Sequence, residues 1–167
     1  MIRFRTATAA DVPALRALVE SAYRGASARR GWTHEADLLD DERTSDAELT
    51  ATIADAKAQV LLARIDGKLA GTVTIRDLGK GRAYLGMLCV DPDLQSEGLG
   101  RALLADAEDM AAEEFGAKVM TMTVIDARAE LIAYYERRGY ARTGELRPFP
   151  LPVDVPYQMV VLERAIG

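Results

Sequence analysis

The chain has 167 residues, of which 49% are hydrophobic and 28% are charged. This balance is typical of a globular protein and excludes an intrinsically disordered chain. The formal net charge is −5 with an isoelectric point near 5.0, and the basic pairs Arg29-Arg30 and Arg137-Arg138 are short. Nucleic acid is therefore not an expected partner, because surfaces that bind it gather positive charge on one face.

The chain contains one cysteine, Cys89, and one histidine. A lone cysteine cannot form an intrachain disulfide, which favours a reducing compartment. The two residues are too few for a zinc site built from soft ligands, so we expect no bound metal. No stretch approaches the roughly 18 apolar residues of a membrane span, and the first residues carry no apolar signal region. These features predict a cytoplasmic protein with no membrane partner.

In chain order, the first half begins with a predicted strand over residues 2–6. Thr8-Ala9-Ala10-Asp11 has the spacing of a capping box, and helical periodicity follows over residues 12–22. Residues 24–41 have no regular period. A second helix is predicted to begin at Ser45, with Glu48 three residues later and Leu49 and Ile53 facing inward.

The middle of the chain has the pattern of a β meander. Strands over residues 60–65 and 69–76 are separated by Asp66-Gly67-Lys68, a hairpin signal of the Asp-Gly type. A third strand is predicted over residues 82–90, where Pro92 follows and ends it.

The second half alternates helices and strands. Leu99, Leu103, Ala107 and Met110 form an apolar stripe that predicts a helix over residues 98–115, with Gly116 as a left-handed cap. A strand follows over residues 119–124, and then a short helix around Tyr135 that is closed by Gly139. Two further strands are predicted over residues 140–144 and 157–162, and the proline-rich residues 147–152 separate them. A meander followed by one strand–helix–strand crossover predicts a single α/β domain over residues 1–167, with a mixed sheet and helices on both faces.

The segment from Val90 to Arg101 carries the clearest chemical signal. A helix that starts among glycines exposes backbone N–H groups and the positive end of its dipole, which suits a pyrophosphate. Gly98 and Gly100 allow a ligand close to the backbone, and Arg101 adds positive charge. The alternative is a glycine turn that only starts a helix.

Two nucleotide-binding motifs are excluded by the same segment. A dinucleotide fingerprint needs a third glycine where Leu103 stands, and the acidic residue expected about 20 residues later is missing. A phosphate loop of the Walker type needs Gly-Lys-Ser or Gly-Lys-Thr, which the sequence lacks.

The sequence resembles the GNAT-type N-acetyltransferases. The pattern Val90-x-Pro92-x-x-Gln95-x-x-Gly98-x-Gly100 matches the family's Val-x-Pro-x-x-Arg/Gln-Gly-x-Gly-x-Gly/Ala motif. A second signature, Tyr-x-x-x-Gly-Phe/Tyr, is similar to the stretch from Tyr135 to Tyr140, and the order of elements agrees over nearly the whole chain. The resemblance implies a mostly antiparallel sheet of about seven strands with splayed central strands, and acetyl-CoA as acetyl donor.

The donor contacts that the resemblance implies lie on the strand ending at Val90 and on the glycine turn. They are Leu88, Cys89, Val90, Gln95, Ser96, Glu97, Gly98, Leu99, Gly100 and Arg101. The chain departs from the family pattern at three positions. Ser96 replaces the first motif glycine, Glu97 brings a carboxylate near the expected phosphates, and Arg128 stands where relatives often carry an asparagine.

The resemblance also implies a mechanism in which the amine attacks directly, without an acyl-enzyme. A backbone N–H near Leu88 to Val90 would polarise the acetyl carbonyl, and Tyr135 would act as general acid for the departing thiolate. Cys89 is then expected to be a small core residue rather than a nucleophile. Tyr134 lies about 100° around the helix and is expected to pack elsewhere.

The acceptor site and the general base are less defined. The irregular segment and the proline-rich loop are where this family tends to form its acceptor pocket, which gives the candidates Trp32, His34, Glu35 and Phe149. No carboxylate occurs from Tyr84 to Leu88, so the base could be His34, Glu35 or Asp37, a chain of waters, or none if the amine loses its proton before binding.

Three functions remain open from the sequence. The first is an N-acetyltransferase acting on a primary amine of a small molecule or peptide. The second is a catalytically silent acyl-CoA-binding module that serves as a sensor or scaffold, and the third is a structural domain without a ligand. Domains of the kind it resembles are often dimers, so a homodimer is a further expectation.

Overall fold

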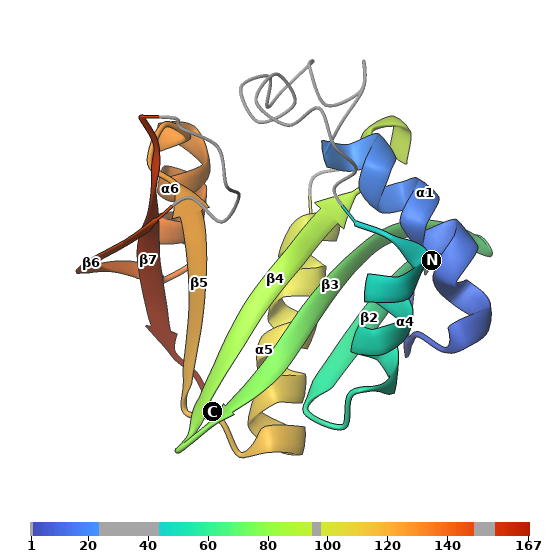
Figure 1. The fold of residues 1–167 in the computed structure, drawn as a ribbon, viewed down its shortest axis with the longest axis horizontal. Coiled ribbons are helices and arrows are strands. Elements are labelled where there is room, and N and C mark those ends of the chain that lie inside the picture. The colour runs from blue at the N-terminus through green and yellow to red at the C-terminus, as the bar shows by residue number, and fades with distance from the viewer. Residues whose placement is uncertain (1, 24–43, 95–97, 149–155) are drawn as a thin grey trace.

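The computed structural model describes residues 2–23, 44–94, 98–148 and 156–167, in which seven strands form one sheet in the order β1-β2-β3-β4-β5-β7-β6 (Figure 1). The strands are β1 (Ile2–Thr6), β2 (Ala58–Ile65), β3 (Lys68–Gly79), β4 (Arg82–Val90), β5 (Val119–Ile125), β6 (Ala141–Pro148) and β7 (Gln158–Ala165). The helices are α1 (Val12–Tyr23), α4 (Asp46–Ala54), α5 (Leu99–Phe115) and α6 (Ala129–Arg137), with short 3-10 turns η1 (Ala9–Asp11) and η2 (Pro92–Leu94). Every neighbouring pair is antiparallel except β4 and β5. The predicted mixed, mostly antiparallel sheet is confirmed.

Two apolar cores lie on opposite faces of this sheet. Successive residues of a strand point to opposite faces, so β2 supplies both cores. Leu61 and Ala63 join the core under α5 and α6, whereas Val60 and Leu62 join the core under α1 and α4. Figure 1 shows α1 and α4 across the sheet from α5.

The predicted helix ends are confirmed where the structure describes them. The Ser45 hydroxyl accepts a hydrogen bond from the Glu48 N–H at 3.1 Å and caps α4. Gly116 ends α5 with φ 64°, in the left-handed region that glycine adopts without steric cost. Leu99, Leu103 and Ala107 are fully buried, as the stripe predicts.

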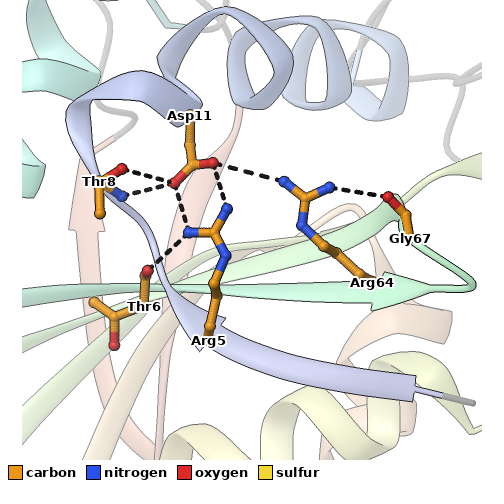
Figure 2. Close-up of polar contacts among 6 residues, drawn as sticks. All are labelled: Arg5, Thr6, Thr8, Asp11, Arg64 and Gly67. Atoms are coloured by element: carbon orange, nitrogen blue, oxygen red, sulfur yellow. Dashed lines mark hydrogen bonds and ion pairs between the residues drawn. The ribbon is translucent and has the colours of Figure 1, made fainter.

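The capping box at Thr8 becomes part of a larger polar cluster (Figure 2). The Thr8 N–H donates to Oδ2 of Asp11 at 2.7 Å, and Arg5 donates to both carboxylate oxygens at 2.6 and 2.8 Å. Nη2 of Arg64 lies 3.6 Å from Oδ1, and Nη1 of Arg64 donates to the Gly67 carbonyl at 3.1 Å. Asp11 thereby joins β1, the start of α1 and the β2–β3 hairpin.

The predicted end of the second-last strand is wrong. We expected it to stop at Gly144 and the proline-rich stretch to begin at Arg147, but β6 continues to Pro148. Among the strands that the structure describes, β6 pairs with β7 alone, and it is exposed along its length. A proline is tolerated there because an edge strand has one side without a ladder partner.

Strands β4 and β5 separate after a short paired stretch. They pair in parallel only where Arg82, Ala83 and Tyr84 face Val119, Met120 and Thr121. The rest of β4, to Val90, and of β5, to Ile125, lies outside this register, and Figure 1 shows the two ribbons diverging. The splayed strands that the resemblance implied are therefore present.

Candidate functional site

A β-bulge interrupts β4 on the border of the splayed region. Thr72 of β3 faces Cys89 and Thr74 faces Gly86. An advance of two residues along β3 therefore corresponds to three residues along β4, which leaves one extra residue on β4. The extra residue bends the strand and takes local backbone out of the regular ladder. Met87 has φ 55°, which is uncommon for a residue other than glycine. The bulge lies directly before Leu88 to Val90, the stretch expected to face the acetyl group.

The side chains of this stretch divide between the two cores. Leu88 and Val90 are half-buried and pack against the core under α5 and α6. Cys89 is 7% exposed and belongs to the core under α1 and α4. That placement supports a packing role for Cys89, as we predicted.

The glycine turn before α5 leaves its backbone accessible. Gly98 has φ 106°, and a Cβ there would meet no atom within 4 Å among the described residues. Helix α5 begins at Leu99, whose side chain is fully buried. The whole of Leu99, backbone included, has 0% of its surface exposed, so its contact with a donor stays a prediction. The Arg101 side chain is exposed. The first N–H groups of any helix lack intrahelical partners, so this end of α5 suits the phosphates of a donor. Gln95, Ser96 and Glu97 lie outside the described residues.

Tyr135 projects from α6 into the core that α6 shares with α5, against which Leu88 and Val90 of β4 pack. Its side chain is 7% exposed, and its ring makes edge-on contacts with Tyr134 and Tyr140, with centroids 5.4 and 6.1 Å away. Burial raises the pKa of Tyr135 above the ordinary phenol value, with smaller raising effects from Tyr134 and Cys89 and a lowering effect from Arg128. The Tyr135 phenol therefore stays protonated at neutral pH.

Arg128 is 8% exposed, which is unusual for an arginine. It directly precedes α6, and its N–H donates to the Ile125 carbonyl at 3.0 Å. The residue that replaces the family's asparagine is therefore buried at the start of α6.

Tyr134 was expected to pack elsewhere, yet it lies beside the glycine turn. A Cβ on Gly100 would be 3.7 Å from the Tyr134 hydroxyl and 3.8 Å from a methyl of Val90. The Arg138 guanidinium covers the Tyr134 ring at 4.9 Å. The sequence did not predict that Tyr134 lies near the donor turn. The 100° offset between neighbouring residues of a helix gives the direction of a side chain but not the element that faces it.

The closed end of the splayed region is tied by side chains. The hydroxyls of Tyr84 on β4 and Thr123 on β5 lie 2.8 Å apart. The Tyr84 ring also lies 3.2 Å from where a Cβ of Gly86 would stand. This hydrogen bond extends the link between the strands beyond the last paired residues.

The predicted acceptor residues Trp32, His34, Glu35 and Phe149 lie outside the described residues, as does the alternative base Asp37. Across the ranges that the structure describes, no three His, Cys, Asp or Glu side chains gather in a way that could hold a metal ion. In the same ranges, no helix is long and apolar enough to cross a membrane.

Residues 15–140 match the model of the acetyltransferase (GNAT) family. The chain belongs to this family. The recognition made from the Val90–Gly100 and Tyr135–Tyr140 motifs is confirmed, and with it an acetyltransferase domain of a family whose acetyl donor is acetyl-CoA.

Two curated relatives resemble part of the chain. An S-(2-succino)cysteine N-acetyltransferase of Bacillus subtilis (strain 168) is 32% identical over 87 residues, which are 48% of this chain and 53% of the relative. A mycothiol acetyltransferase of Propionibacterium freudenreichii is 35% identical over 88 residues, 50% of this chain and 28% of the relative. The chain thus spans about half the length of the first relative and less of the second.

Solved structures resemble the whole fold at low sequence identity. The ribosomal-protein-S18-alanine N-acetyltransferase from Escherichia coli has a TM-score of 0.77 and 21% identity, covering 100% of this chain and 95% of that one. The PaiA N-acetyltransferase from Thermoplasma acidophilum, solved in complex with coenzyme A, has a TM-score of 0.72 and 16% identity, covering 99% of both chains. At these identities the similarity concerns the fold.

Proposed function

We propose that this protein transfers an acetyl group from acetyl-CoA to a primary amine of a small molecule or peptide, by direct attack of the amine. The observation that carries the proposal is the arrangement around β4. The bulge before Leu88 lies where β4 has separated from β5, the open glycine turn of α5 follows it along the chain, and Tyr135 belongs to the core against which Leu88 and Val90 pack.

The residues fit an acetyl-CoA molecule bound along β4. Backbone N–H groups at the start of α5 and the exposed Arg101 would bind the pyrophosphate. The backbone from Leu88 to Val90 would face the acetyl carbonyl, where a fixed N–H donor stabilises the negative charge that develops on oxygen. In the transfer, the neutral amine forms the N–C bond, the C–S bond breaks, and the Tyr135 phenol gives its proton to the thiolate, while the proton lost by the attacking nitrogen passes through water and restores the phenol.

The buried position of Tyr135 gives this role a pH signature. Because burial raises the pKa of Tyr135, its phenol stays protonated to at least the ordinary value of about 10. Turnover at saturating substrate should therefore show no decline from this group below about pH 10. A phenol-dependent decline near neutrality, absent from Tyr135→Phe, would contradict the buried acid.

The amine acceptor would come from the side of residues 24–43 and the loop that contains Phe149. Trp32, His34, Glu35 and Phe149 are proposed as acceptor contacts on sequence grounds. Trp32→Ala should then weaken acceptor saturation far more than acetyl-CoA binding. Equal loss of both, with a lower melting temperature, would make Trp32 a core residue.

Acetyl-CoA binding and turnover test the proposal. Acetyl-CoA at 100 times its dissociation constant should stabilise the fold by about 2.7 kcal/mol, and a free-thiol assay with candidate amines should detect released coenzyme A. Gly100→Val should remove most of the thermal shift, because its methyls would occupy the space near Val90 and the Tyr134 hydroxyl.

Ala105→Val is the matched control, since residue 105 is exposed on the same helix, and it should keep the full shift. An unaltered shift in Gly100→Val would contradict the donor site. A normal shift with no thiol release from any amine would point instead to an acyl-CoA-binding module without turnover.

A further inference from the structure

Glu108 is a buried carboxylate in the middle of α5, with 8% of its surface exposed. Its Oε2 accepts a hydrogen bond from the Tyr140 hydroxyl at 2.8 Å, and its Oε1 accepts one from Nη1 of Arg164 at 2.6 Å. Burying a carboxylate is costly unless it is paired and hydrogen-bonded, and both conditions are met here. The cluster joins α5 to Tyr140, which follows Gly139 after the end of α6, and to Arg164 of β7.

The glycine of the second family motif makes room for this cluster. Gly139 has φ 100°, and a Cβ on it would stand 2.9 Å from Nε of Arg164 and 3.3 Å from its Cδ. The Arg164 side chain therefore crosses over Gly139 on its way to Glu108. Any larger residue at this position would be strained and would also displace the arginine.

Tyr140 connects the cluster to Tyr135. The Tyr140 N–H donates to the Tyr135 carbonyl at 3.1 Å, and the Arg138 N–H donates to the same oxygen at 2.9 Å. The rings of Tyr140 and Tyr135 meet edge-on, with an interplanar angle of 70°. A shift of Tyr140 would therefore move both the backbone and the ring of Tyr135.

We propose that Glu108 is a positioning residue that holds Tyr135 in place for proton transfer, acting through Tyr140 and Arg164. This inference rests on the proposed function. Glu108 lies eight residues after Gly100 on the same helix, a distance of about 12 Å at 1.5 Å per residue. One helix thus carries the donor turn at its start and anchors the proton donor at its middle.

A double-mutant cycle with Tyr135→Phe separates this role from a general effect on folding. The variants are Glu108→Ala and Tyr140→Phe, each made alone and in the Tyr135→Phe background. Glu114→Ala, an exposed acid on the same helix, is the matched control. The measurements are kcat, the KM for acetyl-CoA and the melting temperature.

We expect Glu108→Ala to lower kcat by about 10- to 100-fold, since a displacement of about 1 Å can cost a factor of this size. The KM for acetyl-CoA should change little, because the donor turn is distant. In the Tyr135→Phe background the same substitution should leave kcat unchanged. Glu108→Gln keeps one acceptor oxygen and should recover part of the lost rate, whereas Glu114→Ala should match the wild type.

A loss of kcat that is equal in both backgrounds would overturn the inference, because Glu108 would then act on the fold as a whole. An unchanged kcat in Glu108→Ala, with Tyr135→Phe still impaired, would overturn the inference and leave the proposed function standing. If Tyr135→Phe itself kept full turnover, the general acid of the proposed function would fail, and the inference with it. Where Glu108→Ala does not fold, Tyr140→Phe removes one hydroxyl only and decides by the same criteria.

Discussion

Two buried carboxylates of this protein have similar bonding but different surroundings. Asp11 is paired with Arg5 and accepts the Thr8 N–H, in a cluster at the β1 edge of the sheet (Figure 2). Glu108 is paired with Arg164 and accepts the Tyr140 hydroxyl. Among the described residues, the side chain of Asp11 is bonded to Arg5, Thr8 and Arg64, none of which is a proposed site residue, whereas the Glu108 cluster is two hydrogen-bonded steps from Tyr135.

The contrast indicates that the functional effect of a buried ion pair depends on which neighbouring residues the paired side chains keep in place. Removing one partner of such a pair leaves a buried group unsatisfied, which destabilises the fold. At Asp11 this should be the whole effect. At Glu108 the same loss should also appear in turnover.

Within the comparison of the two clusters, the largest expected effect comes from Gly139→Ala. The new methyl would meet the Arg164 side chain and displace it from Glu108, so we expect kcat to fall by about 10- to 100-fold. Gly144→Ala is the control, because Gly144 also has a positive φ, of 90°, but a Cβ there would meet no atom within 4 Å among the described residues. Both variants should lose stability from backbone strain, Gly139→Ala should lose more because Arg164 leaves the buried Glu108, and only Gly139→Ala should lose turnover. Equal kcat losses would remove the distinction between strain and positioning.

A smaller effect, confined to stability, is expected for Asp11→Ala. It removes charge-assisted hydrogen bonds from a side chain that is 8% exposed, so the free energy of unfolding should fall by about 1.5–3 kcal/mol. Its kcat should stay at the wild-type value. Asp46→Ala, which removes an exposed partner of Arg16, should cost under about 1 kcal/mol. Chemical denaturation with parallel kinetics measures both quantities, and a reduced kcat in Asp11→Ala would break the comparison.

The smallest effect is the acid dependence of that stability. The hydrogen bond from Arg5 holds the pKa of Asp11 well below its usual range. A group with a lowered pKa in the folded state stabilises above its unfolded pKa of about 3.9, and this contribution is lost as the pH falls further. Melting temperatures below pH 4 should therefore decline more steeply in the wild type than in Asp11→Asn. Identical slopes would assign the acid sensitivity to other carboxylates.

Local sequence signals predicted the elements that depend on short-range chemistry. The Ser45 cap, the capping box at Thr8, the left-handed Gly116 and the buried stripe of α5 are each encoded within a few residues. The family motifs added the splayed strands. The bulge at Met87 was not predicted, although Gly86 inside the predicted strand was an available signal, because its exact position and the positive φ of Met87 depend on how β4 pairs with β3.

Glu108 was missed for a related reason. It lies next to the predicted stripe, between the buried Leu104 and Ala111, where a charge suggests an exposed edge of the helix. Its partners Tyr140 and Arg164 are 32 and 56 residues away in sequence, so the pairing exists only in the folded chain. A charged residue flanked by apolar residues at helical spacing was the one available signal.

The measurement that tests the central claim most directly is the turnover of Tyr135→Phe. The substitution keeps the ring and its packing but removes the proton, so the melting temperature and acetyl-CoA binding should barely change. Because general acid catalysis contributes about 10²- to 10⁴-fold, kcat should fall by a factor in that range if thiolate protonation limits the rate. Wild-type turnover in Tyr135→Phe, together with a loss in Tyr134→Phe, would contradict the account and assign the proton to the neighbouring ring.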